Sequence, residues 1–349
     1  MHILITGGGG FIGSHVAETY AGNGHQVTVL DNLSRAKLLG KPEGDSHFIW
    51  DHLGVLPSVT RVVGSVLDRP LVEELMRRAE VVVHAAAQTA VTTSVIDPVS
   101  DFETNAVGTF RILEAARGTG RRIPVVLTST NKVYGDNVNR IPIREGSTRY
   151  EFGPEFESGV PESVSVDGCE HTPYGASKLS ADLYAQEYAH LYGLPTAVFR
   201  MSCIYGPRQF GVEDQGWVAH FAISALTERP ITIFGDGKQV RDVLYVGDLV
   251  SAIEKFIDRV EEFPAGLVCN IGGGPRHTLS LLELLEYLEQ KTGRRPNVRF
   301  ADWRPSDQRV YVSDVRRAKM RLGWEPLVSA QDGLRTTVDW VRRNLDLFQ

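Results

Sequence analysis

The chain lacks the features that would place it in a membrane, on nucleic acid or around a metal. Its 349 residues include only three cysteines, Cys169, Cys203 and Cys269, which lie far apart and show no metal-binding spacing. No uninterrupted apolar stretch approaches the ~20 residues that span a bilayer. The formal net charge is only −6, which favours neither nucleic acid nor an anionic membrane. We therefore expect no metal site, no nucleic-acid partner and no membrane association.

The sequence also shows no sign of secretion. The first expected strand begins at His2, which leaves no room for a signal peptide. Three separate cysteines suit a reducing compartment, so a cytoplasmic location is the simplest interpretation. An apolar fraction of 42% is enough to bury a core, and the length suits one large domain or two smaller ones.

The first half of the chain alternates short apolar runs with helical patterns. Strands separated by helices predict parallel βαβ units with right-handed crossovers, and hence an α/β fold with a Rossmann-type doubly wound parallel sheet. The expected strands are 2–6, 26–30, 61–63, 81–84, 124–128 and 196–199, and the expected helices are 11–21, 69–78, 101–116 and 174–192.

A glycine-rich turn follows the first expected strand. Gly7, Gly10 and Gly13 are spaced three residues apart, and Phe11 and Ile12 open the next helix. Glycines at such positions allow a tight turn, close approach of a pyrophosphate and close packing of helix on strand. The free amides of the helix amino terminus then favour phosphates. The sequence predicts a dinucleotide site here; the alternative is a glycine-rich turn without a ligand.

Asp31 ends the second expected strand, about twenty residues after the turn. A carboxylate there accepts bonds from ribose hydroxyls and repels a ribose phosphate, which favours NAD over NADP; Arg35 nearby weakens this preference. The alternative for Asp31 is an ordinary turn residue. After the fourth strand, the small side chains of Ala85, Ala86 and Ala87 would let a cofactor lie flat against the backbone, unless they simply pack the loop.

Tyr174 and Lys178 stand four residues apart, on one face of an expected helix. A free phenol has a pKa of about 10, and a nearby ammonium lowers that pKa by stabilising the phenolate. A positive nicotinamide ring should act in the same direction. Tyr174 would then take a hydroxyl proton as hydride leaves the carbon, and return it on reduction. The alternative is a chance pair on a helix surface.

Thr130 follows a parallel strand, at the carboxyl edge where such folds bind ligands. Its hydroxyl suits a hydrogen bond to the reacting oxygen and stabilisation of a developing oxyanion. The alternative is a hydroxyl that only caps loop amides.

These segments together resemble the extended short-chain dehydrogenase/reductases that act on nucleotide sugars, and the resemblance covers essentially the whole chain. It implies Thr130, Tyr174 and Lys178 as catalytic residues and NAD as cofactor. It implies cofactor contacts at the glycine turn and Asp31, and further contacts at Asn32, Ser34, Arg35, Ser65, Val66, Ala85, Ala86, Ala87, Gln88, Asn105, Thr128, Tyr174, Lys178 and Met201. At Ser65 relatives usually carry an Asp that touches adenine, so this position departs from the pattern.

The alternation of strand and helix patterns changes from about Gly206, where Gly, Pro, Arg and aromatic residues become frequent. We predict an NAD-binding domain over 1–205 and a smaller α/β substrate-binding cap over 206–349, with 244–257 returning to the first domain as an alternative. By resemblance, Arg241 and Arg304 contact the substrate diphosphate, and Arg forks suit phosphate oxygens. The remaining substrate contacts that we expect are Thr130, Asn131, Lys132, Cys203, Arg208, Gln209, Gln215, Trp217 and Asp307.

Asn131 and Lys132 stand where the sugar 4,6-dehydratases of this family carry Asp-Glu, as the acid and base for water elimination. Neither side chain suits those roles, so elimination is disfavoured. The run Ser129–Asp136, with Arg208-Gln209-Phe210 and Asp302-Trp303-Arg304-Pro305, resembles the CDP-paratose 2-epimerase (CDP-tyvelose epimerase) branch.

That branch implies a nucleotide-sugar epimerase that oxidises carbon 2 of the sugar to a ketone and reduces it again. The alternatives are a UDP-hexose 4-epimerase, another nucleotide-sugar oxidoreductase, or a catalytically silent NAD-sensing scaffold, which retention of both Tyr174 and Lys178 disfavours. By family analogy, the helices 101–116 and 174–192 form the interface of a homodimer or homotetramer. Phe102, Phe110, Leu183 and Tyr188 are the apolar residues expected there.

Overall fold

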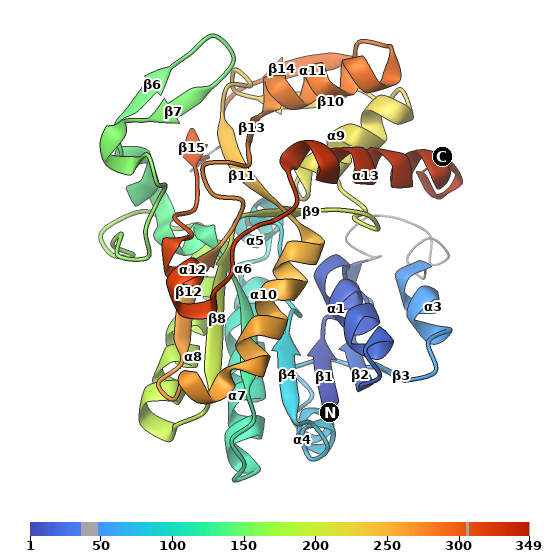
Figure 1. Cartoon of the computed structure of the whole chain (residues 1–349), viewed down its shortest axis with the longest axis vertical. Helices are drawn as coiled ribbons and strands as arrows, with labels where there is room; N and C mark the ends of the chain where they lie inside the picture. Colours follow the sequence, from blue (N-terminus) through green and yellow to red (C-terminus); the bar gives the residue numbers. More distant parts are fainter. Residues whose placement is uncertain (36–47, 305–306, 349) are drawn as a thin grey trace. The chain divides into compact units, whose positions relative to one another are not determined.

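A seven-stranded sheet organises the computed structural model, which describes residues 1–35, 48–304 and 307–348. The order is β12-β8-β5-β4-β1-β2-β3, with parallel pairing between neighbours such as β1 and β4. The sequence-based prediction of a doubly wound parallel sheet is confirmed (Figure 1). The strands are β1 (His2–Thr6), β2 (Gln26–Asp31), β3 (Val59–Val63), β4 (Val81–His84), β5 (Val125–Thr130), β8 (Thr196–Met201) and β12 (Leu267–Ile271).

The central strands are mostly apolar and buried because helices cover both faces of the sheet. Every residue of β4 and β5 is buried. One face packs against α4 (Arg69–Met76), α7 (Gly108–Gly118) and α8 (Pro173–Tyr192), whose buried side chains share a core with those of the strands. Figure 1 shows α1 (Phe11–Gly22) and α10 (Val246–Asp258) in front of the sheet, where Asn23 donates to Glu254 at 3.2 Å.

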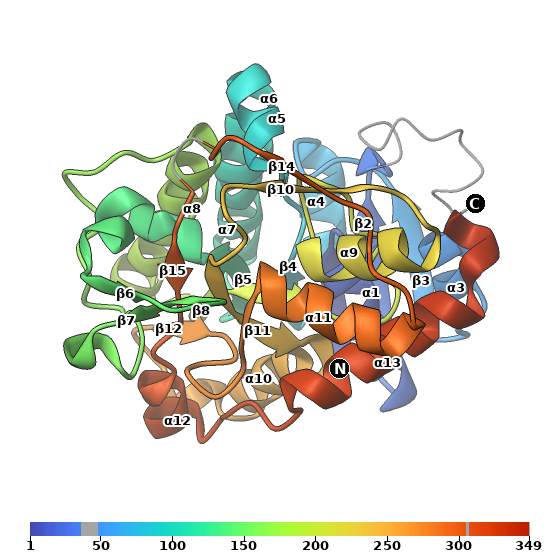
Figure 2. The same ribbon diagram turned by 90° about the horizontal axis from the view of Figure 1, so that it is seen from above.

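A π-helical turn interrupts the helix expected over 101–116. The chain instead forms α6 (Pro98–Phe102), the π-helix η1 (Glu103–Val107) and α7. Figure 2 shows α5 (Val91–Ile96) and α6 at the end of α7. Such single-turn π segments are frequent at functional sites, and Asn105 lies within this one.

The chain divides into two compact units. The first comprises Met1–Val133, Pro173–Arg200 and Val250–Cys269, and the second comprises Tyr134–Thr172, Met201–Leu249 and Asn270–Gln349. Residues 134–172, which the sequence analysis placed with the first domain, belong to the second unit. The roles predicted for the two domains remain predictions.

The second unit is built from small sheets and helices. Strand β11 (Val240–Tyr245) pairs with β9 (Cys203–Tyr205), β13 (Thr278–Ser280) and β15 (Val310–Tyr311), and β10 (Ile231–Phe234) pairs with β14 (Val298–Ala301). A hairpin joins β6 (Ile143–Glu145) to β7 (Tyr150–Phe152). The helices are α9 (Trp217–Leu226), α11 (Leu281–Thr292), α12 (Arg316–Leu322) and α13 (Ala330–Arg343), and α3 (Phe48–Gly54) belongs to the first unit. Among the described helices, none is long and apolar enough to cross a membrane.

Candidate active site

The glycine turn leaves no room for side chains at two of its predicted positions. Gly7 has φ +70°, and a Cβ there would lie 2.5 Å from the Ala86 nitrogen. A Cβ on Gly13 would lie 2.4 Å from the Gly7 carbonyl oxygen, so α1 packs directly on the turn. Gly10 caps α1, and its amide donates to the Gly7 carbonyl at 3.0 Å. Phe11 and Ile12 form the first turn of α1. The turn therefore presents bare backbone beside a helix amino terminus.

Asp31 lies at the end of β2, beside that turn. Its Oδ2 accepts from the Gly9 amide at 2.9 Å, and its Oδ1 accepts from the Leu33 amide at 2.8 Å. Burial raises the pKa of the Asp31 carboxyl, while the two amides and Arg35 oppose that rise. A carboxylate has lone pairs beyond these two bonds, so it retains the capacity to accept from hydroxyl groups.

The other residues expected around the cofactor fall into two groups. Half-buried Ala85, Ala86 and Ala87 follow β4, and exposed Asn32 and Ser34 follow β2. The second group makes contacts within the protein. Val66 packs in the core under α4 and α7. The Ser65 hydroxyl accepts from the Leu67 amide at 3.1 Å, and the Thr128 hydroxyl donates to the His84 carbonyl at 3.1 Å. Met201 ends β8 and is half-buried.

Gln88 and Asn105 meet each other in the protein interior. The Asn105 amide nitrogen donates to the Gln88 carbonyl at 3.0 Å, and the Gln88 backbone amide donates to the Asn105 Oδ1 at 2.9 Å. Both side chains also donate to Asp101. These internal bonds give both residues a role in fixing the loop after β4; a direct cofactor contact by either remains a prediction.

Thr130, Tyr174 and Lys178 come together at the carboxyl end of β5. Thr130 ends β5, while Tyr174 and Lys178 lie in the first two turns of α8. The Thr130 and Tyr174 side chains share a hydrogen bond. The Lys178 Nζ donates to the Thr128 carbonyl at 2.6 Å. All three side chains are buried, so the predicted catalytic residues form one buried cluster.

The protein's own groups raise the phenol pKa, whereas the predicted lowering also counts on a bound nicotinamide. Burial raises the pKa of Tyr174 to about 12, with Asp101 adding to the rise and the Thr130 hydrogen bond opposing it. The ammonium of Lys178 was expected to lower this pKa, but its shortest contact is the Thr128 carbonyl. Burial also lowers the pKa of Lys178 to about 8, although Asp182 and Asp101 raise it. Within the protein alone, the phenol is therefore a proton donor and a poor base.

Asn131 and Lys132 border the Thr130 hydroxyl directly. Thr130 Oγ1 donates to Asn131 Oδ1 and accepts from the Lys132 backbone amide, both at 3.3 Å. Asn131 is buried and Lys132 is half-buried. An Asn and a Lys at these two positions supply neither the carboxylic acid nor the carboxylate that water elimination in this family uses.

In the second unit, both predicted diphosphate-binding arginines are ion-paired. The Arg241 Nη2 donates to Asp307 Oδ1 at 2.7 Å. The Arg304 Nη2 donates to Asp214 at 2.8 Å, and its guanidinium stacks 3.9 Å from the Phe234 ring centroid. Carboxylates thus hold both guanidinium groups in defined positions. Pro305 and Ser306, which complete the Arg304 motif, lie outside the described residues.

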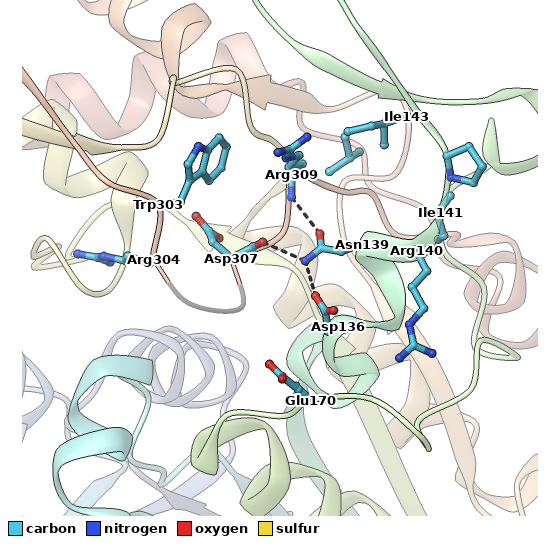
Figure 3. A pocket seen from close by; sticks show the side chains of 12 residues that line it. Asp136, Asn139, Arg140, Ile141, Ile143, Glu170, Trp303, Arg304, Asp307 and Arg309 are labelled. Carbon is cyan, nitrogen blue, oxygen red and sulfur yellow. Dashed lines mark hydrogen bonds between the residues drawn. The ribbon is translucent and has the colours of Figure 1, made fainter.

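A pocket of about 670 Å³ lies next to the Arg304–Asp307 segment within the second unit (Figure 3). The Asn139 amide spans it by donating to Asp136 at 2.6 Å and to the Asp307 carbonyl at 3.0 Å. The lining residues are Asp136, Asn139, Arg140, Ile141, Pro142, Ile143, Glu170, Trp303, Arg304, Asp307, Arg309 and Val310. Two predicted substrate contacts, Arg304 and Asp307, therefore lie on one pocket wall.

The other predicted substrate contacts surround the start of α9. The Trp217 indole donates to the Cys203 sulfur at 3.4 Å and packs edge-on against Phe221. Gln209 is buried and donates to the Ile204 carbonyl at 3.0 Å. Arg208 adopts φ +62°, and the Gln215 backbone pairs with Val212. Most of these polar groups make contacts inside the second unit.

Sequence reasoning overlooked three residues that hold the catalytic cluster. Asp101 is fully buried and accepts from Ser177 Oγ at 2.5 Å. Ser94 Oγ accepts from the Tyr174 amide at 3.1 Å. One usable signal was present, since Asp101 and Asn105 are four residues apart and a carboxylate and an amide at that spacing can pair.

Comparison with known proteins shows which family the chain belongs to. The model of the NAD dependent epimerase/dehydratase family matches residues 3–272. CDP-paratose 2-epimerase of Salmonella typhi is 39% identical over 97% of this chain and 99% of its own length. The UDP-glucose 4-epimerase of Thermus thermophilus, solved with NAD, is 33% identical with a TM-score of 0.76 over 98% of this chain and 99% of its own.

A further solved structure is the UDP-glucuronic acid 4-epimerase of Bacillus cereus, in complex with UDP-glucuronic acid and NAD. It is 26% identical with a TM-score of 0.82 over 99% of this chain and 100% of its own. The resemblance expected from the sequence is thus confirmed, with its implications of an enzyme and of NAD as cofactor. The chain belongs to the NAD dependent epimerase/dehydratase family.

Proposed function

We propose that the protein is a nucleotide-sugar epimerase that inverts carbon 2 of a CDP-linked sugar by transient oxidation and re-reduction. The observation that carries this proposal is the environment of Thr130, where Asn131 and Lys132 provide no acid–base pair for elimination while Tyr174 and Lys178 are retained. The 39% identity to a CDP-paratose 2-epimerase over nearly the whole chain supports the carbon and the nucleotide.

The glycine turn fits NAD. An added Cβ at Gly7 or Gly13 would strike the protein's own backbone, so glycine at these positions permits the tight turn and close helix packing of a dinucleotide-binding loop. The α1 amino terminus offers amide donors to a pyrophosphate, and Asp31 offers carboxylate oxygens to ribose hydroxyls. Bound NAD would supply a hydride acceptor that, once reduced, returns the hydride.

The chain's own residues would handle the proton and the sugar oxygen. Tyr174 would receive the hydroxyl proton during oxidation and return it during reduction. Thr130, already hydrogen-bonded to that phenol, would hold the reacting oxygen. Lys178 would place a positive charge beneath the site. The cluster is buried, so water is kept from the ketone during the cycle.

Substrate binding by the second unit is part of the same proposal. Arg241 and Arg304 are candidates for the diphosphate because guanidinium forks match phosphate oxygens. Asp307 and Asp214 orient them in the protein. Asp307 is also a candidate acceptor for a hydroxyl of the nucleotide or sugar.

A UDP-hexose 4-epimerase is the second candidate. Epimerisation at carbon 4 would need the same Thr130, Tyr174 and Lys178, and the solved 4-epimerases with TM-scores near 0.8 support it.

A panel of nucleotide sugars tests both candidates. The purified enzyme would be incubated with CDP-, UDP-, GDP- and dTDP-linked sugars, and products followed by proton NMR. We expect carbon-2 inversion of a CDP-sugar without net consumption of added NAD. Inversion at carbon 4 of a UDP-sugar would select the second candidate. Oxidised product that forms only as an equal amount of added NAD is reduced to NADH would indicate a dehydrogenase.

We also propose that the enzyme is cytoplasmic and assembles as a homodimer or homotetramer. Its first unit exposes apolar side chains over α5 to α8, on helices that lie near one another (Figure 2). Such a patch is unusual for a monomer's surface. Its members are Val95, Ile96, Val99, Phe102, Phe110, Leu183, Tyr184, Leu191 and Tyr192. Tyr188, also expected there, is buried because its hydroxyl donates to Glu114 at 2.5 Å and its ring packs on Phe110.

A further inference from the structure

Asp101 is a fully buried carboxylate next to the catalytic pair. It lies in α6 and has no exposed surface. Its Oδ1 accepts from Gln88 at 2.9 Å and from Asn105 at 3.1 Å, and its Oδ2 accepts from Ser177 at 2.5 Å. Burial raises the pKa of the Asp101 carboxyl, while the hydrogen bonds from Ser177 and Gln88 and the charge of Lys178 oppose that rise, so these partners stabilise its charged form.

Ser177 connects this carboxylate to the turn that carries Tyr174 and Lys178. Its hydroxyl lies 2.5 Å from Asp101 and 3.1 Å from the Tyr174 carbonyl, so its single proton belongs mainly to the shorter, charge-assisted bond. The Tyr174 amide is held by Ser94 of α5. The first turn of α8 is therefore attached to α5 and α6 by side chains on both sides.

We propose that Asp101 is a positioning residue for the reaction, which fixes the first turn of α8 through Ser177 and serves as the buried counter-charge of Lys178. The proposal rests on the function proposed above for Tyr174 and Lys178. None of the sequence motifs assigned a role to this carboxylate.

The charged groups around Lys178 distinguish Asp101 from its neighbours. Asp182, one turn later on α8, also faces Lys178, but it is paired with Arg200 of β8 at 2.9 Å and accepts from Ser129 of β5. His84 of β4 is buried with its pKa lowered to about 3, so it is neutral. Asp97, the N-cap of α6, is exposed. Asp101 is thus the facing carboxylate with no guanidinium partner among the contacts described.

The sign of the effect follows from this geometry. A negative charge near Lys178 stabilises its ammonium and raises the Lys178 pKa, and the same charge raises the Tyr174 pKa by disfavouring the phenolate. Removing the charge should lower both values. Lys178 would then lose its proton at a lower pH, and the alkaline limb of the pH profile of kcat should move to lower pH.

The test combines D101N with S177A and D97N. D101N removes the charge but keeps the shape, while S177A removes the link to α8 and keeps the carboxyl with its bonds from Gln88 and Asn105. The matched control D97N removes an exposed charge from the same helix, and Asn serves equally well as its N-cap. NMR of protein labelled at the lysine ε-carbons follows Lys178 directly, since the chain has only eight lysines.

In D101N we expect the Lys178 titration to move to lower pH and kcat to fall about 10- to 100-fold. In S177A we expect a lower kcat and an unchanged Lys178 titration. In D97N we expect both kcat and the Lys178 titration to stay unchanged. An unchanged Lys178 titration in folded D101N would overturn the counter-charge role, and S177A at full activity would overturn the positioning role.

If D101N does not fold, S177A still decides the positioning role. The NMR titration needs no substrate, so it separates this inference from the proposed function. A shifted Lys178 titration with no product from any nucleotide sugar would refute the function alone.

Discussion

The Tyr174 hydroxyl is the group on which the proposed chemistry depends most directly. Burial and Asp101 hold its pKa at about 12, so at neutral pH it carries its proton. The positive nicotinamide ring of bound NAD, with the Lys178 ammonium, would favour the phenolate. The phenol should therefore act as a base only in the loaded enzyme, which limits proton loss in the free protein.

Replacing Tyr174 by Phe should remove turnover and spare cofactor binding. The ring would keep its buried position, while the hydroxyl that exchanges the proton would be lost. We expect kcat to fall by roughly 10²- to 10⁴-fold, the usual contribution of a general acid or base. NMR product assays measure the turnover, and calorimetric titration with NAD measures the binding.

Tyr188→Phe is the matched control for this substitution. Tyr188 lies on the same helix and also uses its hydroxyl, which donates to Glu114. Loss of the Tyr188 hydroxyl should leave kcat within about twofold of the wild-type value and lower the unfolding free energy by only about 1 kcal/mol. Comparable activity in Tyr174→Phe and Tyr188→Phe would contradict the assignment of Tyr174.

For single residues, motif spacing predicts which side chains meet in the site better than it predicts their pKa values. The four-residue interval brings Tyr174 and Lys178 to one end of α8, and Thr130 meets them as expected. Within the protein alone, burial and Asp101 raise the pKa of Tyr174, and the predicted lowering by Lys178 and a bound nicotinamide stays a prediction for the loaded enzyme. Neither the burial nor the effect of Asp101 is visible in a linear motif, since both arise from segments far apart in the chain.

At the level of elements, the join between β1 and α1 is the most sterically restricted part of the candidate cofactor site. Replacing Gly13 by Ala would place a Cβ 2.4 Å from the Gly7 carbonyl and 2.7 Å from the Gly8 Cα. The helix must then move away from the turn. We expect a loss of roughly 1–3 kcal/mol of unfolding free energy and weaker NAD binding, measured by denaturant titration and by calorimetry.

Gly22→Ala provides the control on the same helix. Gly22 is the last residue of α1 and is exposed, and no neighbouring atom lies within 4 Å of the place that an alanine Cβ would take. Alanine there should stabilise the protein by up to about 1 kcal/mol and leave NAD affinity unchanged. Equal effects on NAD affinity at both positions would show that α1 is merely destabilised and that the turn plays no special part.

The elements that sequence patterns missed are those set by tertiary packing. The strand β12 is a short, mostly apolar run between glycines that includes Asn270, a pattern that fits a strand or a buried helical turn equally well. The alternative that 244–257 returns to the first domain stays a prediction; in the structure, the residues of α10 from Val250 onward belong to the first compact unit. The π-helical turn at Asn105 depends on its bonds to Gln88 and Ser177, which no periodicity records.

At the scale of the whole molecule, the apolar patch over α5 to α8 indicates assembly. Side chains such as Leu183, Leu191 and Tyr192 are about half or more exposed, and each contributes apolar surface that association would bury. Both α7 and α8 belong to this patch, so the catalytic helix would be braced by a second copy. A two-fold axis would present every patch residue twice.

The double substitution Leu183→Glu with Leu191→Glu should separate the copies. Four carboxylates would enter the interface of a two-fold dimer, where burial and mutual repulsion oppose association, and we expect dissociation to become easier by roughly 100-fold or more. Size-exclusion chromatography with light scattering should then report a species near the 38.6 kDa chain mass. Leu327→Glu, also exposed but in the second unit, should leave the assembly intact. A wild-type protein already monomeric at tens of micromolar would refute the proposed interface, because its exposed patch would then have no second copy to cover it.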